Sequence, residues 1–158
     1  MTILRRLLLW YFAGEICVLF MFNFQVIFPT VLYPSFLIDL HSKYCSLFND
    51  SFCFPDLWYQ GIQFTRFIAT LPLIILVKDL YTGNKRFFPA ILYSVASFSL
   101  ISPVLFDIIL SHKKHKIWLI SLNLIEIGML SLLLKYAYNH TKFTFKRLSQ
   151  PEVIIRKE

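Results

Sequence analysis

Three ionisable side chains lie in segments that are otherwise apolar. Glu15, Arg66 and Glu126 each fall well inside a different hydrophobic run. A charge placed there is costly to insert into a bilayer, so such a side chain faces the interior of a helix bundle and takes a partner. Arg66 keeps its proton and needs an acceptor or water; Glu126, near mid-span, is the better-placed acceptor and Glu15 is the other. The three residues predict either a buried ion pair that fixes helix register or a polar pocket at the bundle centre.

Other polar side chains in these runs recur at spacings of three and four residues, which places them on one face of a helix. Pro72 and Pro103 also lie inside two of the runs, where each removes a backbone hydrogen bond and predicts a kink that opens space between helices. The pattern therefore predicts an inward polar seam, formed by Gln63, Arg66 and Thr70 in the second run, Tyr93 and Ser97 in the third, and Asn123 and Glu126 in the fourth.

The elements that carry these residues are long enough to cross a bilayer, which takes about 20 residues of helix. Of the 158 residues, 57% are hydrophobic and only 16% are charged, which excludes an ordinary soluble domain. Backbone groups in lipid must be satisfied within the segment, so the runs must be helices. The first run is too long for a signal peptide, and we expect it to be retained. We predict an all-α integral membrane protein, a four-helix bundle with Pro-kinked helices over residues 7–138, the helices spanning 7–28, 58–77, 87–110 and 117–138.

Four spans place both termini on one side, with residues 1–6 and the basic tail 139–158. That side carries eleven Lys and Arg residues against four on the other, which predicts that both termini are cytosolic. The run 112–116 argues for the opposite orientation, because it is basic, short and close to two spans. The net charge of +7 lies mostly in loops and the tail, where a bilayer surface with anionic lipids accounts for it better than nucleic acid.

The one extended connection, residues 29–57, carries apolar side chains at helical spacing. They predict a short amphipathic helix that lies against the bundle on the lumenal side, either as a plain cover or as a gate over a cavity. Cys45 and Cys53 in this connection would form a disulfide if it faces an oxidising compartment, but their spacing alone leaves the pairing open. Asn49 begins a glycosylation sequon on the same side. The amphipathic face consists of Phe36, Leu37, Leu40, Tyr44, Leu47 and Phe48.

Several short motifs in a fixed order resemble the EXPERA-domain family, and more narrowly its sigma-2 receptor branch. They are Phe28-Pro29, Leu32-Tyr33-Pro34, Leu71-Pro72 and the stretch from Pro89 to Val95. The resemblance covers roughly residues 8–138. It implies a multi-pass protein of the endoplasmic reticulum membrane with cytosolic termini and a pocket for sterols or amphiphilic amines. For a fungal member of the branch, it implies a role in quality control and targeting of mitochondrial precursor proteins at the reticulum surface.

Matching single positions to the branch gives a mixed result. Asp50 corresponds to an Asp in the middle of the first loop. The two acidic positions that hold amine ligands fall on Asn23 and Arg66, which cannot form that salt bridge, and Glu126 falls on a pocket-lining Tyr. An Arg66–Glu126 pair is our hypothesis for a local replacement. The expected pocket residues are Glu15, Asn23, Gln63, Arg66, Thr70, Tyr93, Asn123 and Glu126, with Asp50, Pro72 and Pro103 in structural roles.

Three classes of function compete. The first is a non-enzymatic reticulum membrane protein that binds lipid, with sterol, precursor proteins, degradation machinery and a second copy of the chain as candidate partners. The second is a sterol isomerase, which needs an acid and a base near an apolar ligand; Glu15 and Glu126 are the candidates, and all four His residues fall outside the spans. The third is a small transporter component with these charges on an ion path. We favour the first, and expect no catalytic residue, cofactor or metal and no nucleic-acid partner.

Overall fold

The computed structural model describes residues 2–48, 57–84, 87–110 and 116–148, and of Phe48 and residues 140–148 the backbone alone. Within these ranges every regular element is a helix, which confirms the all-α prediction. The elements are four long helices, a shorter one and two 3₁₀ segments, namely α1 (Ile3–Met21), η1 (Asn23–Val26), η2 (Thr30–Leu32), α2 (Ser35–Phe48), α3 (Leu57–Thr82), α4 (Phe88–Leu110) and α5 (Lys116–Leu148).

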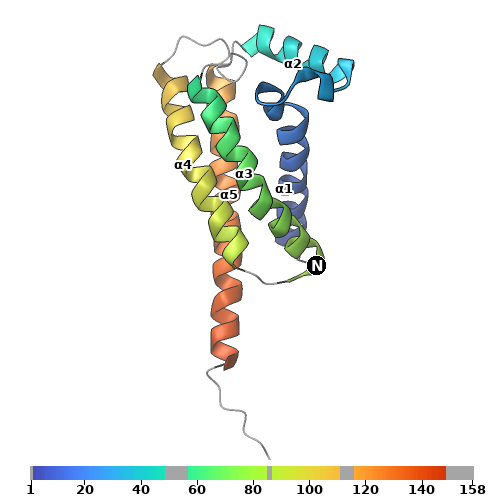
Figure 1. The fold of residues 1–158 in the computed structure, drawn as a ribbon. Coiled ribbons are helices and arrows are strands. Elements are labelled where there is room, and N and C mark those ends of the chain that lie inside the picture. The colour runs from blue at the N-terminus through green and yellow to red at the C-terminus, as the bar shows by residue number, and fades with distance from the viewer. Residues whose placement is uncertain (1, 49–56, 85–86, 111–115, 149–158) are drawn as a thin grey trace, which may run out of the picture.

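The four long helices run antiparallel in chain order, so that α1 begins and α5 ends at the same end of the bundle (Figure 1). The short helix α2 lies across the opposite end. Each long helix belongs to a segment long and apolar enough to cross a membrane. The chain is therefore a multi-pass membrane protein, with candidate spans at Ile3–Val26, Leu57–Thr82, Phe88–Leu110 and Lys116–Asn139.

The first span differs from the predicted helix 7–28 at both ends. α1 begins at Ile3 because Thr2 caps it, its hydroxyl accepting from the Arg5 backbone N–H at 3.4 Å. The helix ends at Met21, and the chain continues through η1. There the side-chain amide of Gln25 donates to the carbonyl oxygen of Met21 at 2.6 Å and to that of Leu37 at 3.3 Å. These bonds tie the end of α1 to α2.

The third helix runs to Thr82, five residues beyond the predicted end at 77. Gly83 stops it with φ of 84°, and its N–H donates to the carbonyl oxygen of Asp79 at 2.8 Å. Arg5 satisfies two further carbonyls of this terminus, donating to Leu80 at 2.6 Å and to Tyr81 at 2.8 Å. A cation at a helix C-terminus is favourable, and here it also joins the start of α1 to the end of α3.

Pro72 and Pro103 both lie inside continuous helices, α3 and α4. Helix α4 starts at Phe88, one residue after the predicted start, and α5 continues to Leu148 where 138 was predicted as the end of the helix. The last turns of α5 therefore belong to the segment that we had expected to be a tail.

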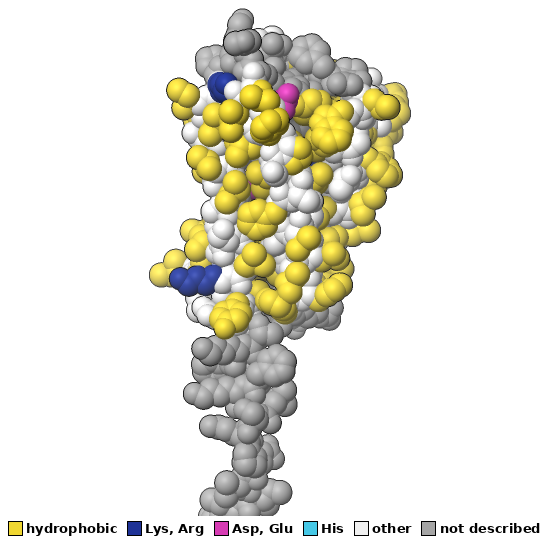
Figure 2. All heavy atoms as spheres, turned by 90° about the vertical axis from the view of Figure 1, so that its left-hand side faces the viewer, with side chains coloured by type: hydrophobic (Ala, Val, Ile, Leu, Met, Phe, Trp, Pro, Cys, Tyr) yellow, Lys and Arg dark blue, Asp and Glu magenta, His cyan; other side chains and the backbone are white. Residues whose placement is uncertain are grey.

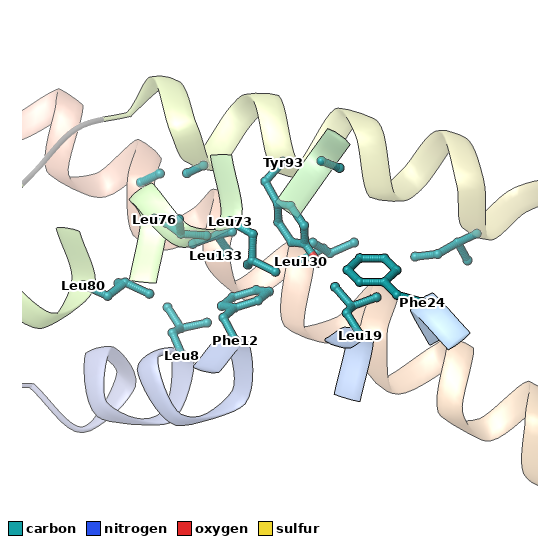
Figure 3. Packing of buried hydrophobic residues seen from close by; sticks show 14 residues of the cluster. Leu8, Phe12, Leu19, Phe24, Leu73, Leu76, Leu80, Tyr93, Leu130 and Leu133 are labelled. Atoms are coloured by element: carbon teal, nitrogen blue, oxygen red, sulfur yellow. The ribbon is translucent and has the colours of Figure 1, made fainter. Parts of the chain in front are cut away.

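The core lies where α1, α3, α4 and α5 meet along the bundle axis. Figure 3 shows Phe12 from α1 among leucines of α3 and α5, with the Tyr93 ring of α4 close by. Phe12 packs edge-to-face on Tyr93, with ring centroids 5.7 Å apart. Fully buried members of this cluster, with no solvent-exposed surface, are Leu8, Phe12, Phe24, Leu73, Leu130 and Leu133.

The outer surface of the bundle is apolar. Large side chains such as Leu71, Val95 and Phe106 each expose more than half of their surface. Figure 2 shows hydrophobic side chains covering the middle of the face on the left of Figure 1, with basic side chains toward its ends. In water such a surface would aggregate, whereas in a bilayer it faces acyl chains.

Helix α2 forms in the extended connection, as predicted, but its apolar face does not pack as expected. Leu37 is buried, whereas Phe36, Leu40 and Leu47 are exposed, so that part of the prediction is wrong. The helix crosses the end of α1, where only a few of its positions reach the bundle. We expect its exposed apolar side chains to contact the interfacial region of a bilayer.

Candidate functional site

A cavity of about 670 Å³ lies between α1 and α5, beneath α2. Most of its wall is apolar, and exposed lining residues such as Trp10, Val18 and Leu122 leave it open toward the surroundings of the bundle. α3 and α4 each contribute one side chain. The lining residues are Trp10, Tyr11, Gly14, Glu15, Val18, Leu19, Phe22, Asn23, Val26, His41, Tyr44, Arg66, Ile108, Leu119, Leu122, Asn123 and Glu126.

The three predicted ionisable residues meet in this cavity. Arg66 of α3 places Nη2 3.9 Å from Oε2 of Glu126 on α5, and the two side chains are only 16% and 18% exposed. Glu15 of α1 lines the same space, and one of its carboxylate oxygens accepts a hydrogen bond from the Tyr93 hydroxyl of α4. Its other oxygen, Oε2, is buried and has no hydrogen-bond partner among the described residues. One guanidinium thus faces two carboxylates in a largely apolar space.

The predicted pocket residues divide into those that reach the cavity and those that do not. Glu15, Asn23, Arg66, Asn123 and Glu126 line it. The remaining three do not line it and pack between helices.

Each of these three has a different environment. Gln63 is completely buried, and its amide has no hydrogen-bond partner among the described residues. The Thr70 hydroxyl donates to the carbonyl oxygen of Arg66 at 2.9 Å, one turn earlier in α3. Tyr93 supports the cavity from behind through its bond to Glu15. Their helical spacing was read correctly, but that face of α3 and α4 meets other helices.

Sequence reasoning missed the contribution of α2. His41 and Tyr44 of this helix line the cavity together with Asn23, so the end of the cavity nearest α2 is polar as well. The two residues are three positions apart and share a helix face. That spacing was visible in the sequence, and a gate over a cavity was one of the two roles predicted for this helix, but neither residue was included among the expected pocket residues.

Several predicted features of the first loop lie outside the described residues, namely Asn49, Asp50 and Cys53. Cys45 is disulfide-bonded. Cys17, on α1, is a free and exposed thiol. In the part of the chain that the structure describes, no three His, Cys, Asp or Glu residues are grouped closely enough to hold a metal ion.

No family model matches the chain. The function is therefore inferred from the cavity and its lining residues.

His41 is partly buried at the α2 end of the cavity, and this burial lowers its pKa below the ordinary value near 6.5. The unfolded chain then takes up a proton at a higher pH than the folded protein does. We expect the stability of the fold to decrease as pH falls through about 6.5, down to the lowered folded-state pKa. The measurement is the free energy of unfolding in mixed micelles at about pH 7.5 and about pH 5.5.

The matched control is His41→Gln, which keeps a polar side chain and removes the titration. Its loss of stability between the two pH values should be smaller than that of the wild type. An equal loss in both proteins would assign the pH dependence to other groups.

Proposed function

We propose that this protein holds a membrane amphiphile, a sterol or a lipid of similar shape, in the cavity between α1 and α5. The observation that carries the proposal is the cavity itself, whose volume of about 670 Å³ falls within the range of small-molecule sites, about 300–1,000 Å³. Its apolar walls suit a hydrocarbon body. Its few polar groups, which include Glu15, Asn23 and Arg66, are placed to orient a polar end.

The surroundings of the cavity favour a ligand that arrives from the bilayer. Trp10 and Leu122 line the cavity and are exposed on opposite walls, α1 and α5. In a multi-pass protein this surface faces lipid, so an amphiphile has a direct path between the two helices. A water-soluble ligand would have to pass α2, which covers the polar end.

A cavity-filling substitution tests the proposal. Gly14 lines the cavity, and a Cβ added there would meet nothing within 4 Å, so a phenyl group at this position projects into free space. We expect Gly14→Phe to fold and to lose the lipid that copurifies with the wild type in mild detergent by at least about tenfold, or 1.4 kcal/mol of affinity. The measurement is quantitative lipid mass spectrometry.

Gly61→Phe is the control, because Gly61 lies in α3, also has open space around its added Cβ, and does not line the cavity. It should retain wild-type lipid. Retention of the same lipid in Gly14→Phe would remove the cavity as the binding site.

We further propose that the protein resides in the endoplasmic reticulum membrane with both termini cytosolic and supports quality control of mitochondrial precursors. The support is the EXPERA-like order of motifs, such as Phe28-Pro29 and Leu71-Pro72, together with the excess of positive charge on the side of the termini. A disulfide at Cys45 suits an oxidising compartment on the side of α2.

Gly14→Phe and Gly61→Phe also test the proposed quality-control role, when each is expressed in cells that lack the protein. Gly61→Phe should restore clearance of precursors stranded on the reticulum, and Gly14→Phe should fail if the bound lipid is needed. Failure of the wild-type protein to restore clearance would contradict the quality-control role and leave the lipid site untouched.

One observation favours a sterol isomerase as the alternative. His41 lines the cavity with Glu15 and Glu126, so groups able to move protons surround the space in which a sterol would lie. The test is expression in cells that lack a sterol isomerase, with the isomerised sterol as the readout. Restored product would replace the non-enzymatic proposal.

A further inference from the structure

Glu15 carries a buried hydrogen-bond acceptor that the fold leaves unpaired. One of its carboxylate oxygens accepts from the Tyr93 hydroxyl, whereas Oε2 is buried and has no hydrogen-bond partner among the described residues. Buried polar atoms are normally hydrogen-bonded, and one without a partner is costly. An unpaired acceptor on a residue that lines a cavity is therefore a candidate contact for a ligand.

The face of α1 that carries Glu15 is a wall of the cavity. Tyr11, Gly14 and Val18 line the same cavity, and their spacing of three and four residues places them on one side of the helix with Glu15. Gly14 has no side chain, and a Cβ added there would meet nothing within 4 Å. Open space therefore lies directly beside Glu15, where a bound ligand comes close to the carboxylate.

The depth of Glu15 limits the polar groups that can reach it. The residue lies near the middle of its 24-residue candidate span, Ile3–Val26. A ligand that enters between α1 and α5 brings its polar end to that depth through hydrocarbon. An ammonium or phosphate group is costly there, whereas a neutral hydroxyl costs far less. A ligand carboxylate would in addition face two carboxylates, those of Glu15 and Glu126.

We propose that Glu15 selects ligands with a free hydroxyl, which donates a hydrogen bond to Oε2. This inference rests on the proposed function and narrows its ligand to a neutral alcohol of sterol-like shape. A carboxylate accepts hydrogen bonds and donates none, so its partner must be a donor. The oxygen of a ketone or an ester accepts only, and would leave Oε2 unpaired with a second acceptor against it. The cavity should therefore hold a free sterol and reject the corresponding ketone.

The experiment compares two sterols that share one carbon skeleton, cholestanol with its hydroxyl and cholestanone with its ketone. Each is radiolabelled, and its equilibrium binding to the full chain is measured in mild detergent. We expect the wild type to bind cholestanol more tightly than cholestanone by at least about tenfold, because a hydrogen bond to a charged group is lost with the ketone.

Glu15→Gln tests whether this residue makes the selection. Glutamine keeps the size of the side chain and an oxygen that can accept from Tyr93, but it puts an NH₂ donor in place of Oε2. Cholestanone should then bind at least as tightly as cholestanol. The control is Asp39→Asn, which makes the same change from carboxylate to amide at an exposed position of α2 that does not line the cavity. It should keep the wild-type preference.

The outcomes separate this inference from the proposed function. Equal binding of the two sterols by the wild type would overturn the selection by Glu15 and leave the cavity as a lipid site. Tighter binding of the ketone would also overturn it, because Oε2 would then carry a proton and donate. An unchanged preference in folded Glu15→Gln would assign the selection to another residue. Binding of neither sterol would contradict the sterol ligand of the proposed function, and this inference with it. The wild-type comparison decides even if the variant does not fold.

Discussion

In the Arg66→Ala variant, we expect the free energy of unfolding to fall by about 3 kcal/mol, the cost typical of removing one member of a buried ion pair. In the double variant Arg66→Ala with Glu126→Ala, the loss should be only about 1 kcal/mol. A second truncation should therefore restore most of what the first one costs.

The geometry explains the sign of this difference. Arg66 and Glu126 approach to 3.9 Å, and both are largely removed from solvent in a cavity that Glu15 also lines. Removing the guanidinium leaves two carboxylates facing an apolar space without the nearby cation. Removing Glu126 as well leaves Glu15 with its hydrogen bond from Tyr93. The stability of each variant therefore depends more on the charge that remains in the cavity than on the contact that was lost.

The measurement is unfolding by SDS in mixed micelles, followed by tryptophan fluorescence. Lys78→Ala is the control, since it removes an exposed cation from the same helix and should change stability by less than about 1 kcal/mol. Equal losses in the single and double variants would show that water entering the cavity screens the pair, and would remove the ion pair as a stabilising element.

The four spans could be predicted from the sequence because their cause is local. A run of apolar residues of bilayer length specifies a helix without reference to any other part of the chain. The ends of the helices depend on contacts, and there the prediction was weaker. Thr2 caps α1 ahead of the apolar run, and Arg5 of α1 satisfies the last carbonyls of α3. The length of α5 was missed because its last turns mix apolar residues with basic and hydroxyl side chains and so do not continue the uninterrupted apolar run.

The candidate site could be predicted in part for a related reason. Charges inside an apolar run must face inward, which was enough to place Glu15, Arg66 and Glu126 together. Helical spacing gives the face on which a polar residue lies but not what lies opposite. Gln63 and Thr70 share a face with Arg66, yet they meet packed helices while Arg66 meets the cavity. His41 was missed because its role depends on the tertiary position of α2.

Apart from the charged residues of the cavity, Phe12 is the residue whose truncation we expect to lower the stability most. Its ring is fully buried and packs edge-to-face on Tyr11, at 5.1 Å, and on Tyr93, at 5.7 Å. Tyr11 lines the cavity, and Tyr93 donates to the Glu15 carboxylate. Phe12 therefore holds one wall of the cavity from behind. We expect Phe12→Ala to lower the free energy of unfolding by about 2–3 kcal/mol and to reduce the amount of copurified lipid.

The expected loss is at the low end for a buried Phe because the bilayer changes the reference state. In the unfolded protein within the micelle or membrane, the ring leaves the core for an apolar environment, so little transfer free energy is lost. What remains is the packing and the void left behind. Phe64→Ala in α3 is the control, since that ring is 57% exposed on the lipid-facing surface and should change stability by less than about 0.5 kcal/mol. If the two substitutions cost the same, the ring of Phe12 would not be a packing element, and the cavity wall would owe its position to the Tyr93–Glu15 hydrogen bond alone.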